Sequence, residues 1–125
     1  MIVTFNACAQ VDACLTSLAA ARIALTHEIV AVDNASADDV VAMMRSRHPH
    51  VEVVALEANV GFSRANNIGI RRSRGDLVLL LNGDTLVPPG AVDALAAVLD
   101  RDPDVGVVGP RLVNGRGEIE LSFGR

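Results

Sequence analysis

The stretch EIVAVD, residues 28–33, decides the fold, because it is a short apolar run that ends in an acid. Such a run, without an alternating polar face, is typical of a strand buried on both sides of a parallel sheet. Apolar residues recur at helical spacing on either side of it, over residues 11–24 before the run and residues 40–44 after it. The centre of the chain therefore reads as helix, strand, helix.

The same alternation continues towards both ends of the chain. Strands are expected over residues 2–5, 28–33, 51–56, 76–82 and 105–108, and further helices over residues 63–72 and 91–99. Residues 76–82, DLVLLLN, are expected to form the most buried of these strands. Short links between alternating strands and helices predict an α/β fold: an open, mostly parallel, Rossmann-like sheet with right-handed crossovers and helices on both faces.

Composition excludes several functional classes. The chain has 125 residues, half of them hydrophobic, and a net charge of −4, which suits one folded domain and argues against nucleic acid as a partner. All eleven basic residues are Arg, so chemistry that needs a Lys, such as a P-loop or a Schiff base, is excluded. Cys8 and Cys14 are too few for a disulfide scaffold and are expected to be buried free thiols.

The sequence shows neither a signal peptide nor a transmembrane segment. Met1 runs directly into a strand pattern, and the longest strongly apolar run, Leu77 to Leu81, is far shorter than the roughly 20 residues that a membrane helix needs. We therefore expect a cytoplasmic protein without a transmembrane segment.

Polar side chains follow four of the expected strands. In open α/β sheets, ligands bind at the carboxyl ends of the strands, where the strand order reverses. Residues of this kind also cap helices and form turns, so one such strand end would mean little, but four at one rim predict a site for a polar ligand. The four strand ends are Thr4-Phe5-Asn6, Asp33-Asn34-Ala35-Ser36, Asn59-Val60-Gly61-Phe62 and Asn82-Gly83-Asp84-Thr85.

Known phosphate-binding loops do not account for this rim. The segment after the first strand, residues 6–9, has no glycine, so the dinucleotide fingerprint G-x-G-x-x-G is absent. Asn82 and Asp84 can supply oxygen ligands to Mg²⁺ or Mn²⁺, although an Asn-Gly-Asp segment alone equally suits an ordinary turn. His48-Pro49-His50 favours a plain turn over a metal site, and Arg71, Arg72 and Arg74 suit a helix carboxyl end, with a diphosphate contact as the second interpretation.

Four segments together carry a family resemblance. Residues 2–6, 29–36, 59–69 and 79–84 resemble the amino-terminal half of a family-2 glycosyltransferase, an inverting enzyme of the GT-A fold, in its rhamnosyltransferase-like bacterial branch. Residues 59–69, NVGFSRANNIG, are the most specific of the four. Together the segments span almost the whole chain in the family's order.

The resemblance implies a nucleotide-sugar site. It would place Asp33 at an N–H of a uracil or thymine base, and it would make Asp84, with Asn82, the ligands of a divalent metal, Mg²⁺ or Mn²⁺. The D-x-D-type motif has Asn at its first position here, so Asp84 would carry most of the metal binding. The positions expected to contact the nucleotide sugar are Thr4, Phe5, Asn6, Asp33, Asn34, Ser36, Asn59, Gly61, Arg64, Asn66, Asn67, Asn82 and Asp84.

The resemblance further implies inverting, metal-dependent transfer from a dTDP- or UDP-sugar to a polysaccharide or lipid-linked acceptor, in the cytoplasm or at the inner face of the membrane. The family's general base comes from the second half of the domain, and Glu118 and Glu120 are expected to be solvated edge-strand charges instead. Residues 1–125 are thus expected to be the nucleotide-sugar-binding part of a domain truncated at its carboxyl end. A carboxyl-terminal half or a second copy would complete it; the alternative is a non-catalytic nucleotide-binding module that lacks the base.

Overall fold

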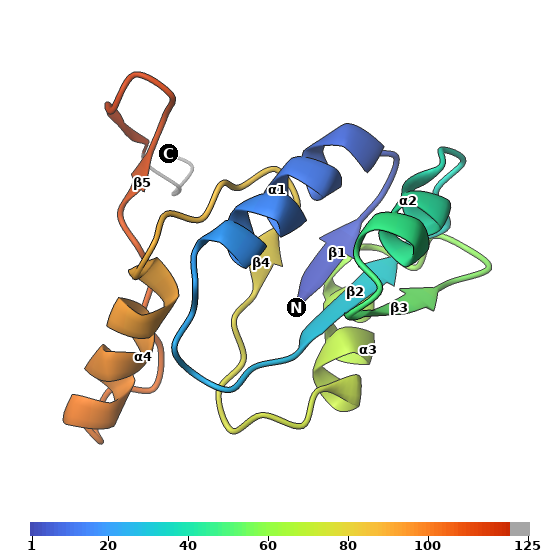
Figure 1. Ribbon diagram of the computed structural model, residues 1–125. Helices are drawn as coiled ribbons and strands as arrows, with labels where there is room; N and C mark the ends of the chain where they lie inside the picture. Colours follow the sequence, from blue (N-terminus) through green and yellow to red (C-terminus); the bar gives the residue numbers. More distant parts are fainter. Residues whose placement is uncertain (121–125) are drawn as a thin grey trace.

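The computed structural model describes residues 1–120 of the chain. Strands and helices alternate along it, and a small hairpin follows the last helix (Figure 1). The elements are β1 (Ile2–Thr4), α1 (Cys8–Ala20), β2 (Ile29–Asp33), α2 (Val40–Arg47), β3 (Val51–Ala55), α3 (Phe62–Arg72), β4 (Leu81–Asn82), α4 (Ala91–Arg101), β5 (Leu112–Val113) and β6 (Ile119–Glu120).

The main sheet is parallel, with the strand order β3-β2-β1-β4. In β1, Val3 lies opposite Val32 of β2 on one side and Asn82 of β4 on the other. Helices α1 and α2 lie on one face of this sheet and α3 on the opposite face (Figure 1). The α/β fold with a parallel sheet and helices on both faces is therefore confirmed.

The core forms on both faces of β2, all five residues of which are buried. Because side chains alternate along a strand, Ile29 and Ala31 join the cluster on the α1 and α2 face, while Val32 faces α3. On that second face, α3 presents Gly69, where an added Cβ would lie 3.1 Å from Cγ2 of Val32. The glycine thus lets the helix approach the sheet closely.

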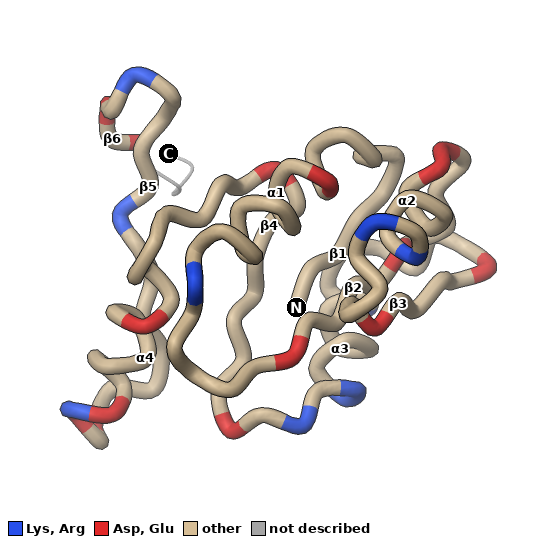
Figure 2. Tube along the Cα trace, viewed as in Figure 1, with Lys and Arg blue, Asp and Glu red and all other residues tan. Residues whose placement is uncertain are grey.

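A polar cluster joins α1 to α2. Asp12 in α1 forms an ion pair with Arg47, and its Oδ1 lies 2.9 Å from Nε2 of the buried His48. The ring of His48 meets that of His50 edge to face, across Pro49. The His-Pro-His segment is therefore the turn that the sequence predicts. Figure 2 shows basic residues at the carboxyl ends of both α2 and α3.

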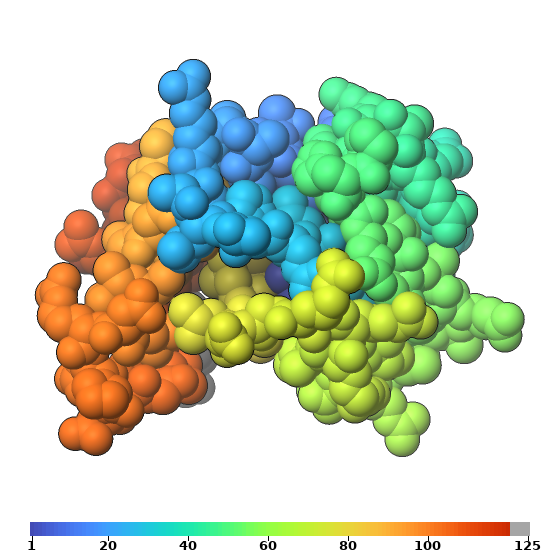
Figure 3. All heavy atoms as spheres, turned by 60° about the horizontal axis from the view of Figure 1, so that its bottom comes forward, coloured from blue at the N-terminus to red at the C-terminus, as the bar shows by residue number. Residues whose placement is uncertain are grey.

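The prediction of a long, deeply buried strand over residues 76–82 is wrong. Only Leu81 and Asn82 are paired as strand, and Leu77, Val78 and Leu80 are 51%, 43% and 55% exposed. The physical reason is position: β4 is the edge strand, and α3 packs against β1 and β2 instead of covering it. Figure 3 shows this segment, in yellow, at the molecular surface.

The predicted strand over residues 105–108 is also absent. Val107 is 87% exposed, and the antiparallel strands that follow are β5 and β6, with Val113 opposite Ile119. Asn114 Oδ1 closes their turn by accepting hydrogen bonds from the N–H groups of Arg116 and Glu118, and Gly117 adopts a φ of +79°. A short apolar run forms a strand only where a neighbouring strand offers hydrogen bonds, and among residues 1–120 this run has none.

Replacement of Gly83 by Ala should destabilise the fold. An added Cβ would lie 2.9 Å from Cγ2 of Val11, which is fully buried and cannot move aside freely. We expect a loss of about 1–3 kcal/mol of unfolding free energy, measured by urea denaturation. Gly106→Ala is the matched control, since a Cβ there meets no atom within 4 Å. An equal effect of the two substitutions would contradict this account of Gly83.

The Cys14 thiol should make stability fall at alkaline pH. Cys14 is buried, and this burial, together with the nearby Asp84 carboxylate, raises its pKa from 9.0 to about 11. The unfolded chain then loses the proton at a lower pH than the folded chain. The contribution of this thiol to the free energy of unfolding is therefore fully present below pH 9 and is lost as pH rises towards 11. Urea unfolding over this range should show a shallower decline in Cys14→Ala; an unchanged slope would refute the prediction.

Candidate functional site

The strand order reverses beside β1, and a pocket opens at that point. Strands β2 and β3 lie to one side of β1 and β4 to the other, so β1 and β4 form the topological switch point. A shallow pocket of about 290 Å³ lies between their carboxyl ends. Its lining residues are Val3, Thr4, Phe5, Ala7, Gln10, Asn82, Gly83 and Asp84. The structure thus brings together four of the predicted site residues: Thr4, Phe5, Asn82 and Asp84.

Two groups in this switch-point pocket lack protein partners. The hydroxyl of Thr4 is buried and has no hydrogen-bond partner among residues 1–120. The exposed Asp84 likewise forms no ion pair or hydrogen bond within the described part of the chain. Because an unpaired buried hydroxyl costs free energy, its persistence at a strand end suits a position where a ligand supplies the partner.

The loops after β1 and β2 are joined by a side-chain network. Ser36 Oγ donates to Asp33 Oδ1 and accepts from the N–H of Asn6 at 2.9 Å, while Ser36 N–H donates to Asp33 Oδ2 at 3.2 Å. Asn6 Oδ1 accepts from the N–H of Ala37 at 2.7 Å. Asn6 and Ala35 adopt positive φ values of 51° and 65°, a strained conformation that this network maintains. The buried Asp33 is therefore held in place beside the rim.

A second network joins β2 to the loop before α3. Asn34 is buried; its Nδ2 donates to Asn59 Oδ1, and its Oδ1 accepts from the N–H of Val60, both at 2.9 Å. Asn59 Oδ1 also accepts from the N–H of Gly61, whose φ is +83°. These contacts give Asn34, Asn59 and Gly61 a structural role in shaping the rim, whatever they contact in a ligand.

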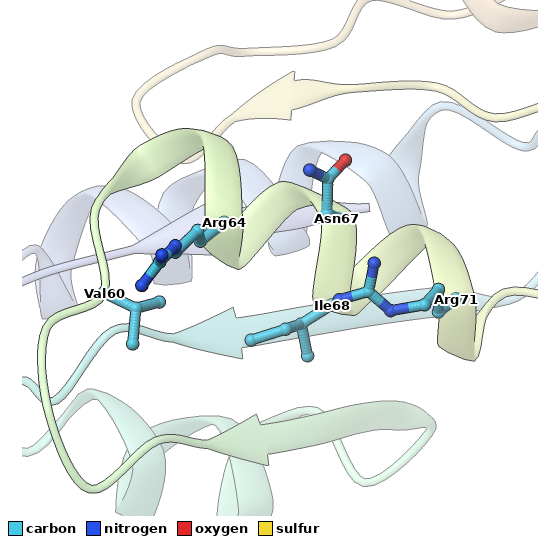
Figure 4. A pocket seen from close by; sticks show the side chains of 5 residues that line it. All are labelled: Val60, Arg64, Asn67, Ile68 and Arg71. Carbon is cyan, nitrogen blue, oxygen red and sulfur yellow. The ribbon is translucent and has the colours of Figure 1, made fainter.

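The remaining predicted residues lie on α3. Arg64 and Asn67 line a separate pocket of about 220 Å³ with Val60, Ile68 and Arg71, and this pocket shares no lining residue with the switch-point pocket (Figure 4). Asn66 is buried, and its Nδ2 donates to the carbonyl of Phe62 at 2.9 Å. The structure therefore distributes the predicted site residues over the switch-point pocket, the two loop networks and α3.

The sequence reasoning missed Gln10 and Ala7, which line the switch-point pocket. Both lie at the start of α1, directly after β1. The signal was available, because the first turn of a helix that follows a parallel strand begins at the carboxyl edge of the sheet.

The residues of the switch-point pocket fit a metal ion that takes some of its ligands from the protein and the rest from a substrate. Residues 1–120 contain no group of three or more His, Cys, Asp or Glu side chains that could hold a metal ion by themselves. The donor set present is one carboxylate, Asp84, and one amide, Asn82. Mg²⁺ is commonly bound by one or two carboxylates together with water and substrate phosphates, so this donor set fits such an ion.

Removal of the Asn34 side chain should loosen the rim. Asn34→Ala would leave the N–H of Val60 without its partner and would leave the Oδ1 of Asn59 with the N–H of Gly61 alone. We expect a loss of about 1–3 kcal/mol in urea unfolding and faster hydrogen exchange at the Val60 amide. Asn67→Ala is the control, because Asn67 is exposed. Unchanged exchange at Val60 would disprove the role of this network.

Comparison with known proteins identifies the family. The family model for glycosyl transferase family 2 matches residues 1–123. An N-acetylglucosaminyltransferase of Bradyrhizobium elkanii is 32% identical over 114 residues, which cover 87% of this chain and 62% of that protein. An undecaprenyl-phosphate 4-deoxy-4-formamido-L-arabinose transferase of Klebsiella pneumoniae is 32% identical over 94 residues, covering 72% of this chain and 29% of its own length.

Solved structures agree on the fold. The crystal structure of S. aureus TarS in complex with UDP-GlcNAc superposes with a TM-score of 0.69 at 24% identity, covering 80% of this chain and 30% of that one. This chain spans less than two thirds of the length of these relatives. In its described part, no helix has the length and apolar character needed to cross a bilayer. By the match over residues 1–123, the chain belongs to glycosyl transferase family 2.

Proposed function

We propose that this chain binds the nucleotide-sugar donor of an inverting glycosyltransferase, with the diphosphate at the switch-point pocket. The observation that carries the proposal is the position of Asp84 and Asn82 at the end of β4, beside the unpartnered hydroxyl of Thr4 at the end of β1. Membership of a glycosyltransferase family supports a sugar nucleotide as the ligand. The crevice at a topological switch point is also where open α/β sheets bind nucleotides.

The nucleotide base is proposed to lie against the loop after β2. Asp33 is buried and already accepts two hydrogen bonds from Ser36. A carboxylate has about four lone-pair sites, so it can also accept the N–H of uracil or thymine. Both UDP and dTDP donors carry this group, which is why the proposal covers both.

Asp84, together with Asn82, is proposed to hold Mg²⁺ or Mn²⁺. When bound, such an ion neutralises charge on the leaving nucleoside diphosphate. The pocket offers an acid where a diphosphate is to bind, so a cation between the two removes their repulsion. Phe5, which is 49% exposed at the pocket, can cover the nucleotide from solvent.

The names of the relatives suggest the sugar and the acceptor. An N-acetylglucosaminyltransferase and an undecaprenyl-phosphate sugar transferase are both about one third identical to this chain. We therefore favour a UDP-linked N-acetylated sugar as donor, and a polysaccharide or lipid-linked glycan as acceptor. We propose that transfer takes place in the cytoplasm or at the inner face of the membrane.

Inverting transfer also needs a general base. The acceptor hydroxyl attacks the anomeric carbon of the sugar, its proton passes to the base, and the nucleoside diphosphate leaves with the electron pair of the broken bond. Asp84 is the only carboxylate that lines the switch-point pocket among residues 1–120. Glu118 is exposed, and its Oε2 accepts from Asn114 in the hairpin. A nucleotide-binding module that does not itself catalyse transfer is the alternative candidate.

Calorimetric titration of UDP and dTDP in the presence of Mn²⁺ tests the donor site. We expect binding that depends on the metal and weakens about tenfold or more in Asp84→Asn, because the main carboxylate ligand is lost. Asp100→Asn, an exposed acid on α4, is the control for net charge. Binding that is indifferent to both Mn²⁺ and Asp84 would overturn the proposed site.

A transfer assay with the 125-residue chain distinguishes the two functional candidates. UDP-GlcNAc and a glycan acceptor are the substrates to offer first. Transfer by this chain would exclude the non-catalytic alternative, whereas nucleotide binding without transfer would favour it.

A further inference from the structure

One side of α1 holds the chain segment that carries Asp84. Residues 83–87 follow β4 at the edge of the sheet, and Figure 1 shows the chain passing along α1 on its way from β4 to α4. Val11, Cys14 and Ser17 of α1 are spaced three residues apart, so their side chains lie on the same side of the helix. Each of the three meets the chain at or after the end of β4.

Val11 and Cys14 hold the first residues of this segment. An added Cβ at Gly83 would lie 2.9 Å from Cγ2 of Val11, so the backbone of Gly83 lies directly against α1. The buried thiol of Cys14 lies 3.8 Å from the carbonyl oxygen of Asn82, to which it donates a weak hydrogen bond. The start of the segment is therefore held mainly by close packing.

Ser17 holds the other end of the segment. Its Oγ accepts a hydrogen bond from the N–H of Val87 at 2.9 Å, across 70 positions of sequence, and donates to the carbonyl oxygen of Cys14 at 2.7 Å. Because the hydroxyl proton is used by Cys14, the lone pairs of the oxygen are free to face Val87. Within residues 1–120, this is the only hydrogen bond that links residues 83–87 to an element other than β4.

The Asp84 carboxylate depends on these contacts for its position. Its side chain is exposed and forms no ion pair or hydrogen bond in the part of the chain that the structure describes, so its position follows from that of its backbone. That backbone runs between Gly83 and Val87, both of which α1 holds. Ala7 and Gln10, at the start of α1, also line the switch-point pocket. One helix thus places both the acid and part of the pocket around it.

We propose that Ser17 is a positioning residue for the donor site: its hydroxyl holds Val87 and thereby keeps Asp84 at the switch-point pocket. This inference rests on the proposed function, in which Asp84 is the main metal ligand. A role of Ser17 in folding alone would leave the nucleotide affinity of the folded chain unchanged. A positioning role lowers that affinity through Asp84.

Calorimetric titration of UDP in the presence of Mn²⁺ tests this role. We expect Ser17→Ala to weaken binding about threefold or more, because the hydrogen bond that holds the segment is lost. Ala is a good helix former, so the variant should fold. Ser17→Thr keeps the hydroxyl and should restore most of the affinity. Ser46→Ala is the matched control, since in the described chain the Oγ of Ser46 bonds to the carbonyl of Met43, three residues back, and to nothing else.

A double-mutant cycle shows whether the effect passes through Asp84. In an Asp84→Asn background, Ser17→Ala should change UDP affinity by less than about twofold. Hydrogen exchange at the Val87 amide, measured without nucleotide or metal, should be faster in Ser17→Ala.

Three outcomes would overturn the role of Ser17: unchanged UDP affinity in Ser17→Ala, an equal loss in both backgrounds, or unchanged exchange at Val87. Absence of Mn²⁺-dependent UDP binding by the unmodified chain would instead overturn the proposed donor site, and this inference with it.

Discussion

The candidate site depends on the pairing of β1 between β2 and β4. β1 is only three residues long, yet it pairs in parallel with a strand on each side, and its last carbonyl, on Thr4, accepts the N–H of Asn34 at 2.9 Å. This pairing directs the carboxyl ends of three strands to one rim and reverses the strand order beside β1. A polar ligand site can form there because the sheet ends, so backbone and side-chain groups no longer pair with one another.

The two sides of that rim are built differently. On the β2 side, Asp33, Ser36, Asn34 and Asn59 bond to one another or to the backbone, so their geometry is fixed before any ligand arrives. On the β4 side, Asp84 has no partner among residues 1–120, and the Thr4 hydroxyl is unsatisfied. A rigid side suits recognition of a planar base, whose contacts are directional. The β4 side, with these unpartnered groups, suits a diphosphate and a cation, because each can bind to the other as well as to the protein.

The sequence predicted the fold well for a strand that helices cover on both faces. Residues 29–33 are buried because helices cover both faces of β2, as the continuous apolar run indicates. Leu77, Val78 and Leu80 are equally apolar but exposed, since burial there depends on what lies beyond the edge strand. The polar residues that follow the strands likewise predicted the position of the switch-point pocket, because the sheet topology alone brings those strand ends together. That Arg64 and Arg71 form no ion pair among residues 1–120 was not predicted, because the ion pairs of α3 form across the sheet and are not local in sequence.

The two pockets differ in electrostatic character because of the charged residues that line them. The switch-point pocket contains an acid and no cation, so a diphosphate can bind there favourably only with a counter-charge that the pocket does not itself supply. The α3 pocket contains two permanent cations and no acid, so its attraction for an anion needs no metal ion. Chelation of the divalent ion should therefore weaken anion binding at the switch-point pocket, whereas ionic strength should mainly screen the exposed guanidinium groups of α3.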